Sequence, residues 1–133
     1  MDARGVPLAA DIAAANVAEV DLAEPVLRQV PIACDMPQQQ TPATGDKAYD
    51  SDELREQLRD AGFDLHSPHR KGRKKPSRND GRKMRRYKRR WIVERTNSWL
   101  QNFRRIVVRY ERHAYLFLAF VQLACAIIAI KQL

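Results

Sequence analysis

The chain has 133 residues, a formal net charge of +8, 44% apolar residues and 30% charged residues, which suffices for one domain and excludes several. Its charge is unevenly divided, because residues 1–69 carry a net charge of −8 and residues 70–133 carry a net charge of +16. The apolar content of the last third excludes a wholly disordered chain, and the basic second half indicates a polyanionic partner.

The two cysteines and the first residues bear on the cellular compartment. Cys34 lies in a segment rich in proline and glutamine and Cys125 lies in an apolar run, and neither belongs to a CxxC motif or a His/Cys cluster. Two free thiols in a reducing cytoplasm are therefore expected, with a structural disulfide as the alternative. Residues 1–14 lack a basic start followed by an apolar run, so the sequence predicts no signal peptide.

The first two expected elements are a strand and a helix. Apolar residues recur at every second position over Gly5–Ala15, which predicts a strand, and Pro7 would place it at a sheet edge or at the strand's beginning. Asn16 is expected to cap the following helix, with Glu19 completing a capping box. Apolar residues at helical spacing continue to Val30, and a proline within this stretch is expected to kink or restart the helix.

A loop, a short helix and a second strand are expected next. Pro31–Thr44 holds three prolines and three glutamines, and this composition predicts a loop. Asp50 is expected to cap a short helix that has two inward-facing leucines and ends at Gly62. Phe63–Ser67 alternates in polarity and predicts a short strand. The pattern to this point is typical of a mixed α/β layer.

Residues 69–90 interrupt this pattern with 13 Lys and Arg among 22 residues. Glycines and a proline predict a loop for the first part, which dense like charge should keep mobile until it meets an anion. From about Arg85 a long helix is predicted to run to about Arg112, and the apolar segment Ala114–Ile130 follows. That segment approaches the length of a membrane span, roughly 17–20 residues, but a helix buried against a sheet is the preferred interpretation.

The helix predicted over residues 85–112 has two contrasting faces at about 100° per residue. One face is apolar and gathers Ile92, Val93, Trp99, Leu100, Phe103, Ile106, Val107 and Tyr110. The other gathers Tyr87, Arg90, Trp91, Glu94, Ser98, Gln101, Arg105, Arg109 and Arg112. Glu94 is the only acid on the second face, and an intrahelical pair with Arg90 would account for it. A carboxylate among arginines is also what a metal-assisted phosphodiester site requires.

The spacing Tyr87-x2-Arg90-x3-Glu94 and the segment Gly45–Asp50 are the most specific motifs in the chain. The first resembles the Tyr-x2-Arg-x3-Glu-x6-Lys signature of bacterial insertion-sequence transposases of the DDE type, with Gln101 in the place of the lysine. The second is similar to the segment that brings the second catalytic aspartate of that family. The resemblance extends over almost the entire chain.

The resemblance implies an α/β fold of the RNase H-like class, incomplete here, with a short mixed sheet, flanking helices and two long C-terminal helices. It also implies a two-metal Mg²⁺ site in which Asp46 and Glu94 are catalytic carboxylates and metal ligands. Tyr87 and Arg90 would contact the DNA backbone near the scissile bond. The other basic residues expected to bind DNA are Lys74, Lys75, Arg82, Lys83, Arg105 and Arg109.

The family's first aspartate has no counterpart in the sequence. Residues 2–8 resemble the turn and strand that follow it, and Asp11 matches no catalytic position. We therefore expect a truncated transposase that is inactive alone. It would form one partial catalytic domain over residues 1–133, with an acidic α/β part at 1–69, a basic loop at 70–84, and the catalytic-Glu helix and buried C-terminal helix at 85–133.

The expected function is DNA transposition, by Mg²⁺-dependent cleavage and strand transfer at transposon ends, in the bacterial cytoplasm near the nucleoid. The expected partners are DNA and either a full-length transposase or a second copy of the chain, with no membrane. One alternative is a small basic nucleic-acid-binding protein without catalysis, which predicts that alanine at Asp46 and Glu94 changes no activity. Another is a polybasic protein that binds anionic lipid headgroups through residues 70–90, which cell fractionation would reveal.

Overall fold

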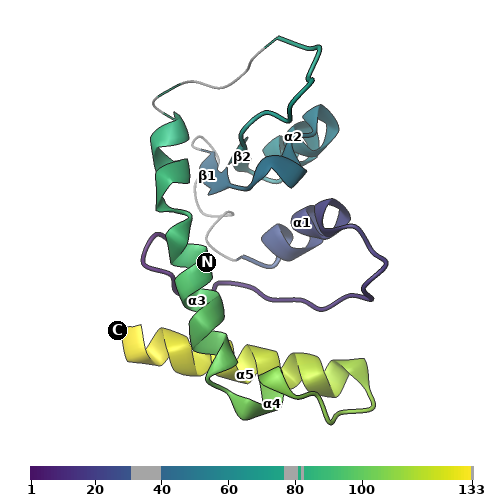
Figure 1. Cartoon of the computed structure of the whole chain (residues 1–133), viewed down its shortest axis with the longest axis vertical. Coiled ribbons are helices and arrows are strands. Elements are labelled where there is room, and N and C mark those ends of the chain that lie inside the picture. Colours follow the sequence, from purple (N-terminus) through teal and green to yellow (C-terminus); the bar gives the residue numbers. More distant parts are fainter. Residues whose placement is uncertain (31–39, 77–80, 82, 133) are drawn as a thin grey trace. The chain divides into compact units, whose positions relative to one another are not determined.

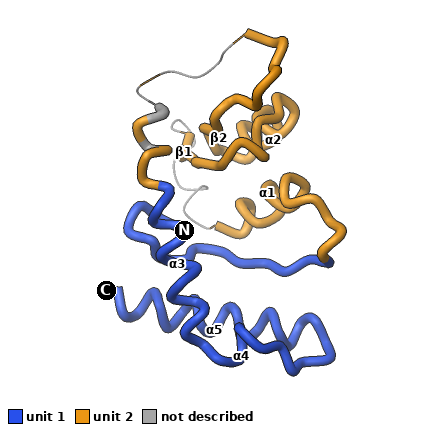
Figure 2. The backbone as a smooth tube through the Cα atoms, in the orientation of Figure 1, with its two compact units in different colours: residues 1–14, 90–133 blue, residues 15–89 orange. Residues whose placement is uncertain are grey.

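The computed structural model describes residues 1–30, 40–76, 81 and 83–132 (Figure 1). The chain divides into two compact units, one formed by residues 15–89 and the other by residues 1–14 together with residues 90–133 (Figure 2). Residues 15–69 of the acidic part belong to the former unit together with the basic loop at 70–84, whereas residues 1–14 and the long apolar helix belong to the latter. Each unit has its own packing.

The unit of residues 15–89 is built on a small parallel sheet. Its described elements are α1 (Glu19–Arg28), β1 (Thr41–Thr44), the 3-10 helix η2 (Lys47–Tyr49), α2 (Asp52–Asp60), β2 (Phe63–His66) and the 3-10 helix η3 (Lys83–Arg89). The two strands pair in parallel, with Thr41 opposite Phe63 and Thr44 opposite His66. Since α2 lies between these strands in the chain, it provides the crossover that parallel pairing requires.

The core of this unit forms where α2 packs against β2. Leu54 and Leu58 of the helix are 4% and 0% exposed, and Phe63 of the strand is 3% exposed. The expected inward leucines, the strand after them and Gly62, which has φ +84°, are confirmed. The expected cap is wrong, because the hydroxyl of Ser51, and not Asp50, accepts a hydrogen bond from the N–H of Leu54 at 3.3 Å.

Three expectations for the first 44 residues are wrong. Residues 5–15 form no strand. The one sheet in the described part of the chain consists of β1 and β2, and residues 5–15 do not pair with either strand. Helix α1 begins at Glu19 with Ala18 at its N-cap, two residues after the expected cap Asn16, and it continues through Pro25. Of the expected loop at Pro31–Thr44, the last four residues are β1, and residues 31–39 lie outside the described residues.

The unit of residues 1–14 and 90–133 is helical, with α3 (Trp91–Gln101), α4 (Arg104–Val107) and α5 (Ala114–Gln132). The long helix expected over residues 85–112 is therefore wrong in extent. Phe103 has an extended backbone (φ −90°, ψ 106°) and so does Val108, which separates α4 from its neighbours. No glycine or proline marks these breaks, because they arise where α4 turns to pack against α5.

The expected apolar face of this helix is only partly buried. Ile92 is 8% exposed, whereas Val93, Val107 and Tyr110 are 43%, 59% and 63% exposed. The buried side of α3 instead includes Thr96, which is 2% exposed and whose hydroxyl donates to the carbonyl of Gly5 at 2.8 Å. The buried apolar face is narrower than predicted for two reasons. Helix α3 ends at Gln101, and the buried side of α3 packs against the amino-terminal turn of the chain.

Helix α5 confirms the second apolar helix expected from the sequence. It packs against α3 and α4, and Ala124 and Ile128 are its buried residues. By length and composition alone it could cross a membrane, since it has 19 residues and a mean hydropathy of 2.1. This helix was expected to pack against the sheet. The sheet belongs to the unit of residues 15–89, so that packing stays a prediction.

A methyl group at Gly5 tests how the amino-terminal turn packs on α3. Gly5 has φ +88°, and an added Cβ would lie 2.8 Å from the hydroxyl oxygen of Thr96 and 3.0 Å from a methyl carbon of Ile92. Gly72 has nearly the same backbone, φ +86°, with nothing within 4 Å of an added Cβ. Gly72→Ala should therefore cost only the left-handed conformation, about 1–2 kcal/mol, and Gly5→Ala about 1 kcal/mol or more beyond that.

Urea unfolding followed by circular dichroism measures both losses. Gly72→Ala is the control, because it makes the same chemical change at the same backbone conformation without the steric contact. Equal losses in the two variants would contradict the packing of Gly5 against α3.

Candidate functional site

Asp46 lies at the carboxyl end of β1, where the chain leaves the parallel sheet. The N–H of Gly45 donates to the carbonyl of His66 at 3.0 Å, so the backbone just before Asp46 is still held by β2. Asp46 caps η2, and its Oδ1 accepts from the N–H of Ala48 at 2.7 Å. Its side chain is exposed, and its other oxygen has no protein partner among the described residues. The carboxyl ends of parallel strands are where ligands commonly bind in α/β folds.

Glu94 lies in the first turn of α3, and its side chain is 68% exposed. Its Oε1 accepts from the guanidinium of Arg90 at 3.3 Å, which confirms the intrahelical pair expected from the sequence. Such an exposed pair contributes only a few tenths of a kcal/mol. The second oxygen of Glu94 has no protein partner in the described part of the chain. The helix thus presents a carboxylate that a ligand can reach.

The two candidate carboxylates belong to different units, Asp46 to residues 15–89 and Glu94 to the helical unit. Their expected convergence on one cation therefore stays a prediction. Within the described ranges, no three His, Cys, Asp or Glu side chains gather as a metal-binding group. The donors themselves fit Mg²⁺, which prefers oxygen ligands from few carboxylates, and each of the two keeps one oxygen without a protein partner in the described residues.

A buried ionic network lies a few residues beyond Asp46, around Asp50. The side chain of Asp50 is 1% exposed, and its Oδ1 lies 2.8 Å from Arg55, 3.1 Å from Arg73 and 3.2 Å from His69. The N–H of Arg70 donates to its Oδ2 at 2.9 Å. Burial alone would raise the pKa of Asp50, but these hydrogen bonds outweigh it and lower the pKa to about 2.

Asp52 extends the network toward the surface. Its carboxylate lies 2.7 Å from Arg73 and 3.1 Å from Lys75, and the hydrogen bond from Arg73 does most to hold the pKa of Asp52 below its usual range. The capping role expected for Asp50 did not reveal these pairs. Arg73, which contacts both aspartates, lies 23 residues from Asp50 and 21 residues from Asp52 in the chain, so no local pattern could reveal its contacts.

The residues predicted to bind DNA have different surroundings. Lys74 is exposed and has no partner among the described residues, whereas Lys75 pairs with Asp52. Arg105 lies 2.9 Å from Glu111, and Arg109 donates to the backbone carbonyl of Glu111 at 3.0 Å. Tyr87 is half-buried in η3, and Arg90 directly precedes α3. Arg82 and the side chain of Lys83 lie outside the described residues.

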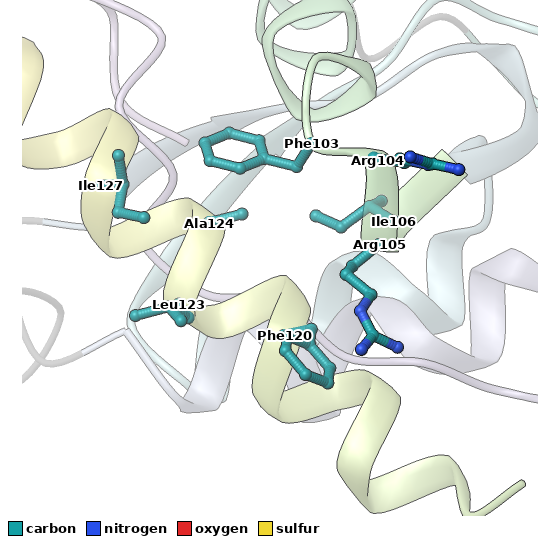
Figure 3. A pocket seen from close by; sticks show the side chains of 8 residues that line it. All are labelled: Phe103, Arg104, Arg105, Ile106, Phe120, Leu123, Ala124 and Ile127. Atoms are coloured by element: carbon teal, nitrogen blue, oxygen red, sulfur yellow. The ribbon is translucent and has the colours of Figure 1, made fainter. Parts of the chain in front are cut away.

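A small apolar pocket lies between α4 and α5 (Figure 3). Phe103 and Ile106 line it from one side, and Phe120, Leu123 and Ile127 line it from α5. The guanidinium of Arg105, which also lines the pocket, sits 5.4 Å from the ring centre of Phe120. No carboxylate lines this pocket, so it offers apolar contact and no ligand for a metal ion.

Comparisons with known proteins agree with the sequence motifs. The family model of the transposase DDE domain matches residues 1–129. A protein of Burkholderia cepacia that is named as a transposase of insertion sequence element IS402 is 35% identical over 131 residues, which are 96% of this chain and 58% of that relative. The chain thus spans less than three fifths of the relative's length. No solved structure matches. The chain belongs to the family of transposase DDE domains of bacterial insertion sequences.

Proposed function

We propose that this chain is part of a transposase that cuts and joins DNA at transposon ends, and that it binds this DNA through its basic residues. The observation that carries the proposal is the exposed carboxylate of Asp46 at the carboxyl end of β1, in a chain of the transposase DDE domain family. Glu94 supports it, since it is equally accessible and lies beside the guanidinium of Arg90. The RNase H-like class is part of the proposal, and the parallel β1-α2-β2 unit is compatible with it.

Members of this family use divalent metal ions. We assign Asp46 and Glu94 as the residues that would hold Mg²⁺ in this chain, since each has a carboxylate oxygen without a protein partner in the described residues. When bound, the metal supplies activation of the attacking oxygen and stabilisation of the leaving oxygen in phosphodiester cleavage.

The protein's own residues would position the DNA around these carboxylates. The guanidinium of Arg90 lies 3.3 Å from Glu94 and its side chain is 54% exposed, so a phosphate oxygen beside this carboxylate would be within its reach. Tyr87 precedes Arg90 by three residues and would contact the same stretch of the DNA backbone. Contacts of this kind fix the register of the duplex without reading its sequence.

The proposed partners are transposon-end DNA and either a full-length transposase or a second copy of this chain. We place the protein in the bacterial cytoplasm at the nucleoid, where its DNA lies. Cys125 is a free thiol, in keeping with a reducing compartment, and Cys34 lies outside the described residues.

Binding of DNA by the chain is the first test of this function. We expect strong, weakly sequence-specific binding whose logarithmic affinity falls linearly with the logarithm of salt concentration, because phosphate contacts release counterions. Fluorescence anisotropy with labelled terminal inverted repeats and with a scrambled duplex measures this. We expect no cleavage by the chain alone, because only two of its carboxylates match the family's three.

A nicking assay with the same repeats and added Mg²⁺ or Mn²⁺ accompanies the binding measurement. Failure to bind either duplex at low salt would contradict the proposed function. Robust nicking by this chain alone would leave DNA binding intact and contradict the expected inactivity.

A further inference from the structure

Residues 70–75 carry five cationic side chains, and their contacts divide them into two groups. Three of them, which we call the anchored group, contact the segment from η2 to the start of α2; they are Arg70, Arg73 and Lys75. The other two, which we call the open group, are exposed and have no partner among the described residues; they are Lys71 and Lys74. The division is not apparent from the sequence, which shows only a dense basic run.

The anchored group holds the basic segment against the turn that carries Asp46. The guanidinium of Arg70 donates to the carbonyl of Lys47 at 3.0 Å and to that of Ala48, the two residues that follow Asp46. Arg73 lies 3.1 Å from Asp50 and 2.7 Å from Asp52. The buried position of Asp50 makes this attachment firm, because a paired charge taken out of water cannot lose its partner cheaply.

Lys71 and Lys74 differ from Lys75 in whether a carboxylate competes with a bound phosphate. Lys75 lies 3.1 Å from Asp52, so a carboxylate already balances its charge and it should release fewer counterions on binding a phosphate. Lys71 and Lys74 have no such partner in the described residues. Gly72 lies between Lys71 and Arg73 with φ +86° and open space around it. No described atom lies within 4 Å of an added Cβ at Gly72, so the turn between the two lysines is not packed against another part of the chain.

We propose that Lys71 and Lys74 bind backbone phosphates of the DNA beside Asp46, and that Asp50 and Asp52 keep them there by fixing Arg70 and Arg73. The inference rests on the proposed function and adds the cations that contact the DNA at this carboxylate. The contacts of Arg70 and Arg73 then hold residues 70–75 in place next to the turn that carries Asp46. The dense charge of residues 70–75 is used in two ways, since the anchored group maintains the fold and the open group engages the ligand.

Charge-removing variants of the full 133-residue chain separate the two groups. The slope of logarithmic affinity against logarithmic salt is negative, and Lys71→Gln and Lys74→Gln should each reduce its magnitude by about 0.9 and the double variant by about 1.8. Lys75→Gln should reduce the magnitude by less than half of the single-variant change. Arg59→Gln, an exposed site on α2 in the same unit, is the matched control and should leave the slope unchanged. Lys71→Arg should retain the wild-type slope.

The readout is fluorescence anisotropy with the labelled inverted-repeat duplex over a range of salt concentrations. Because Lys71 and Lys74 are exposed and have no partner in the described part of the chain, their variants should keep the wild-type unfolding midpoint. A wild-type slope in the double variant, or an equal loss for Lys75→Gln, would overturn the inference while the proposed function stands. A wild-type chain that binds no DNA would overturn both.

Discussion

Replacing Asp50 with alanine is expected to lower the free energy of unfolding of residues 15–89 by about 3–5 kcal/mol. The side chain of Asp50 is 1% exposed, and its partner Arg55, 2.8 Å away, is 8% exposed. Without the carboxylate, the buried guanidinium of Arg55 keeps only Asp52, 3.6 Å away, as a counter-charge. The loss is large because a buried cation that has lost its nearer partner is poorly compensated, and this cost exceeds the net stabilisation from the intact pair.

The size of this loss also reflects how many segments meet at the network. Arg55 of α2 donates to the hydroxyl of Ser67 at 2.6 Å, and Ser67, which follows β2, is fully buried. Arg73 and His69 join the basic segment to the same carboxylate. Removal of one side chain therefore loosens a helix, the end of a strand and a loop together. Hydrogen exchange of the α2 amides, with urea unfolding, would measure the change.

Glu24→Ala is the matched control for Asp50→Ala. Glu24 pairs with Arg28 on α1, and the two side chains are 30% and 57% exposed. An exposed pair of this kind contributes about 0.2–1 kcal/mol. Similar losses in the two variants would show that the Asp50 network is not the buried support inferred from its contacts.

Acid should abolish the contribution of Asp50 to the free energy of unfolding. The pKa of Asp50 is about 2 in the folded chain, below its ordinary value of 3.8. A carboxyl whose folded pKa is depressed stabilises the fold fully above the ordinary value and loses that contribution as the pH falls toward the folded pKa. The difference in unfolding free energy between the wild type and Asp50→Ala should therefore shrink between about pH 4 and about pH 2. A constant difference over this range would contradict the assignment.

Local signals in the sequence predicted those elements whose formation depends on nearby residues. The buried leucines of α2, the left-handed Gly62, the strand after it and the apolar helix α5 all follow from spacing and composition. β1 could not be predicted, because its four residues Thr-Pro-Ala-Thr form a strand only by pairing with β2. The break at Phe103 was also hidden, since tertiary packing of α4 on α5 ends the helix without glycine or proline.

Some residues of the candidate site could likewise be predicted from the sequence, and others could not. The resemblance to the family's motifs indicated Asp46 and Glu94, and both are exposed carboxylates, Asp46 at the N-cap of η2 and Glu94 in the first turn of α3. Thr96 was missed because a threonine on a helix is normally read as polar surface, whereas its hydroxyl here donates to the carbonyl of Gly5 at 2.8 Å and is buried. The Asp50 network was missed because its members become neighbours only after the chain has folded.

Glu94→Gln is expected to reduce strand cleavage at least a hundredfold in a transposase that contains this chain together with the family's first aspartate. The change keeps the volume of the side chain but removes the negative charge that would hold a divalent ion. Its structural cost is small, because Glu94 is 68% exposed and its pair with Arg90 contributes only a few tenths of a kcal/mol. DNA affinity should therefore stay near that of the wild type.

Glu56→Gln serves as the control, since Glu56 is an exposed acid on α2 and its replacement removes the same charge. Gel-based cleavage of labelled transposon ends, normalised to the fraction of DNA bound, separates turnover from binding. A Glu94→Gln enzyme that binds DNA less tightly but cleaves each bound duplex at the normal rate would make Glu94 a DNA contact and no metal ligand.

The proposal that Asp46 and Glu94 hold one ion predicts how their variants combine. Asp46→Asn keeps the cap of η2, because asparagine caps as well as aspartate, and should lower cleavage as severely as Glu94→Gln. If both carboxylates hold the same metal, the loss of either already removes its chemistry, and the double variant should be little worse than either single variant. Losses that multiply would instead mean that the two side chains act at separate places, since independent contributions to the activation free energy add.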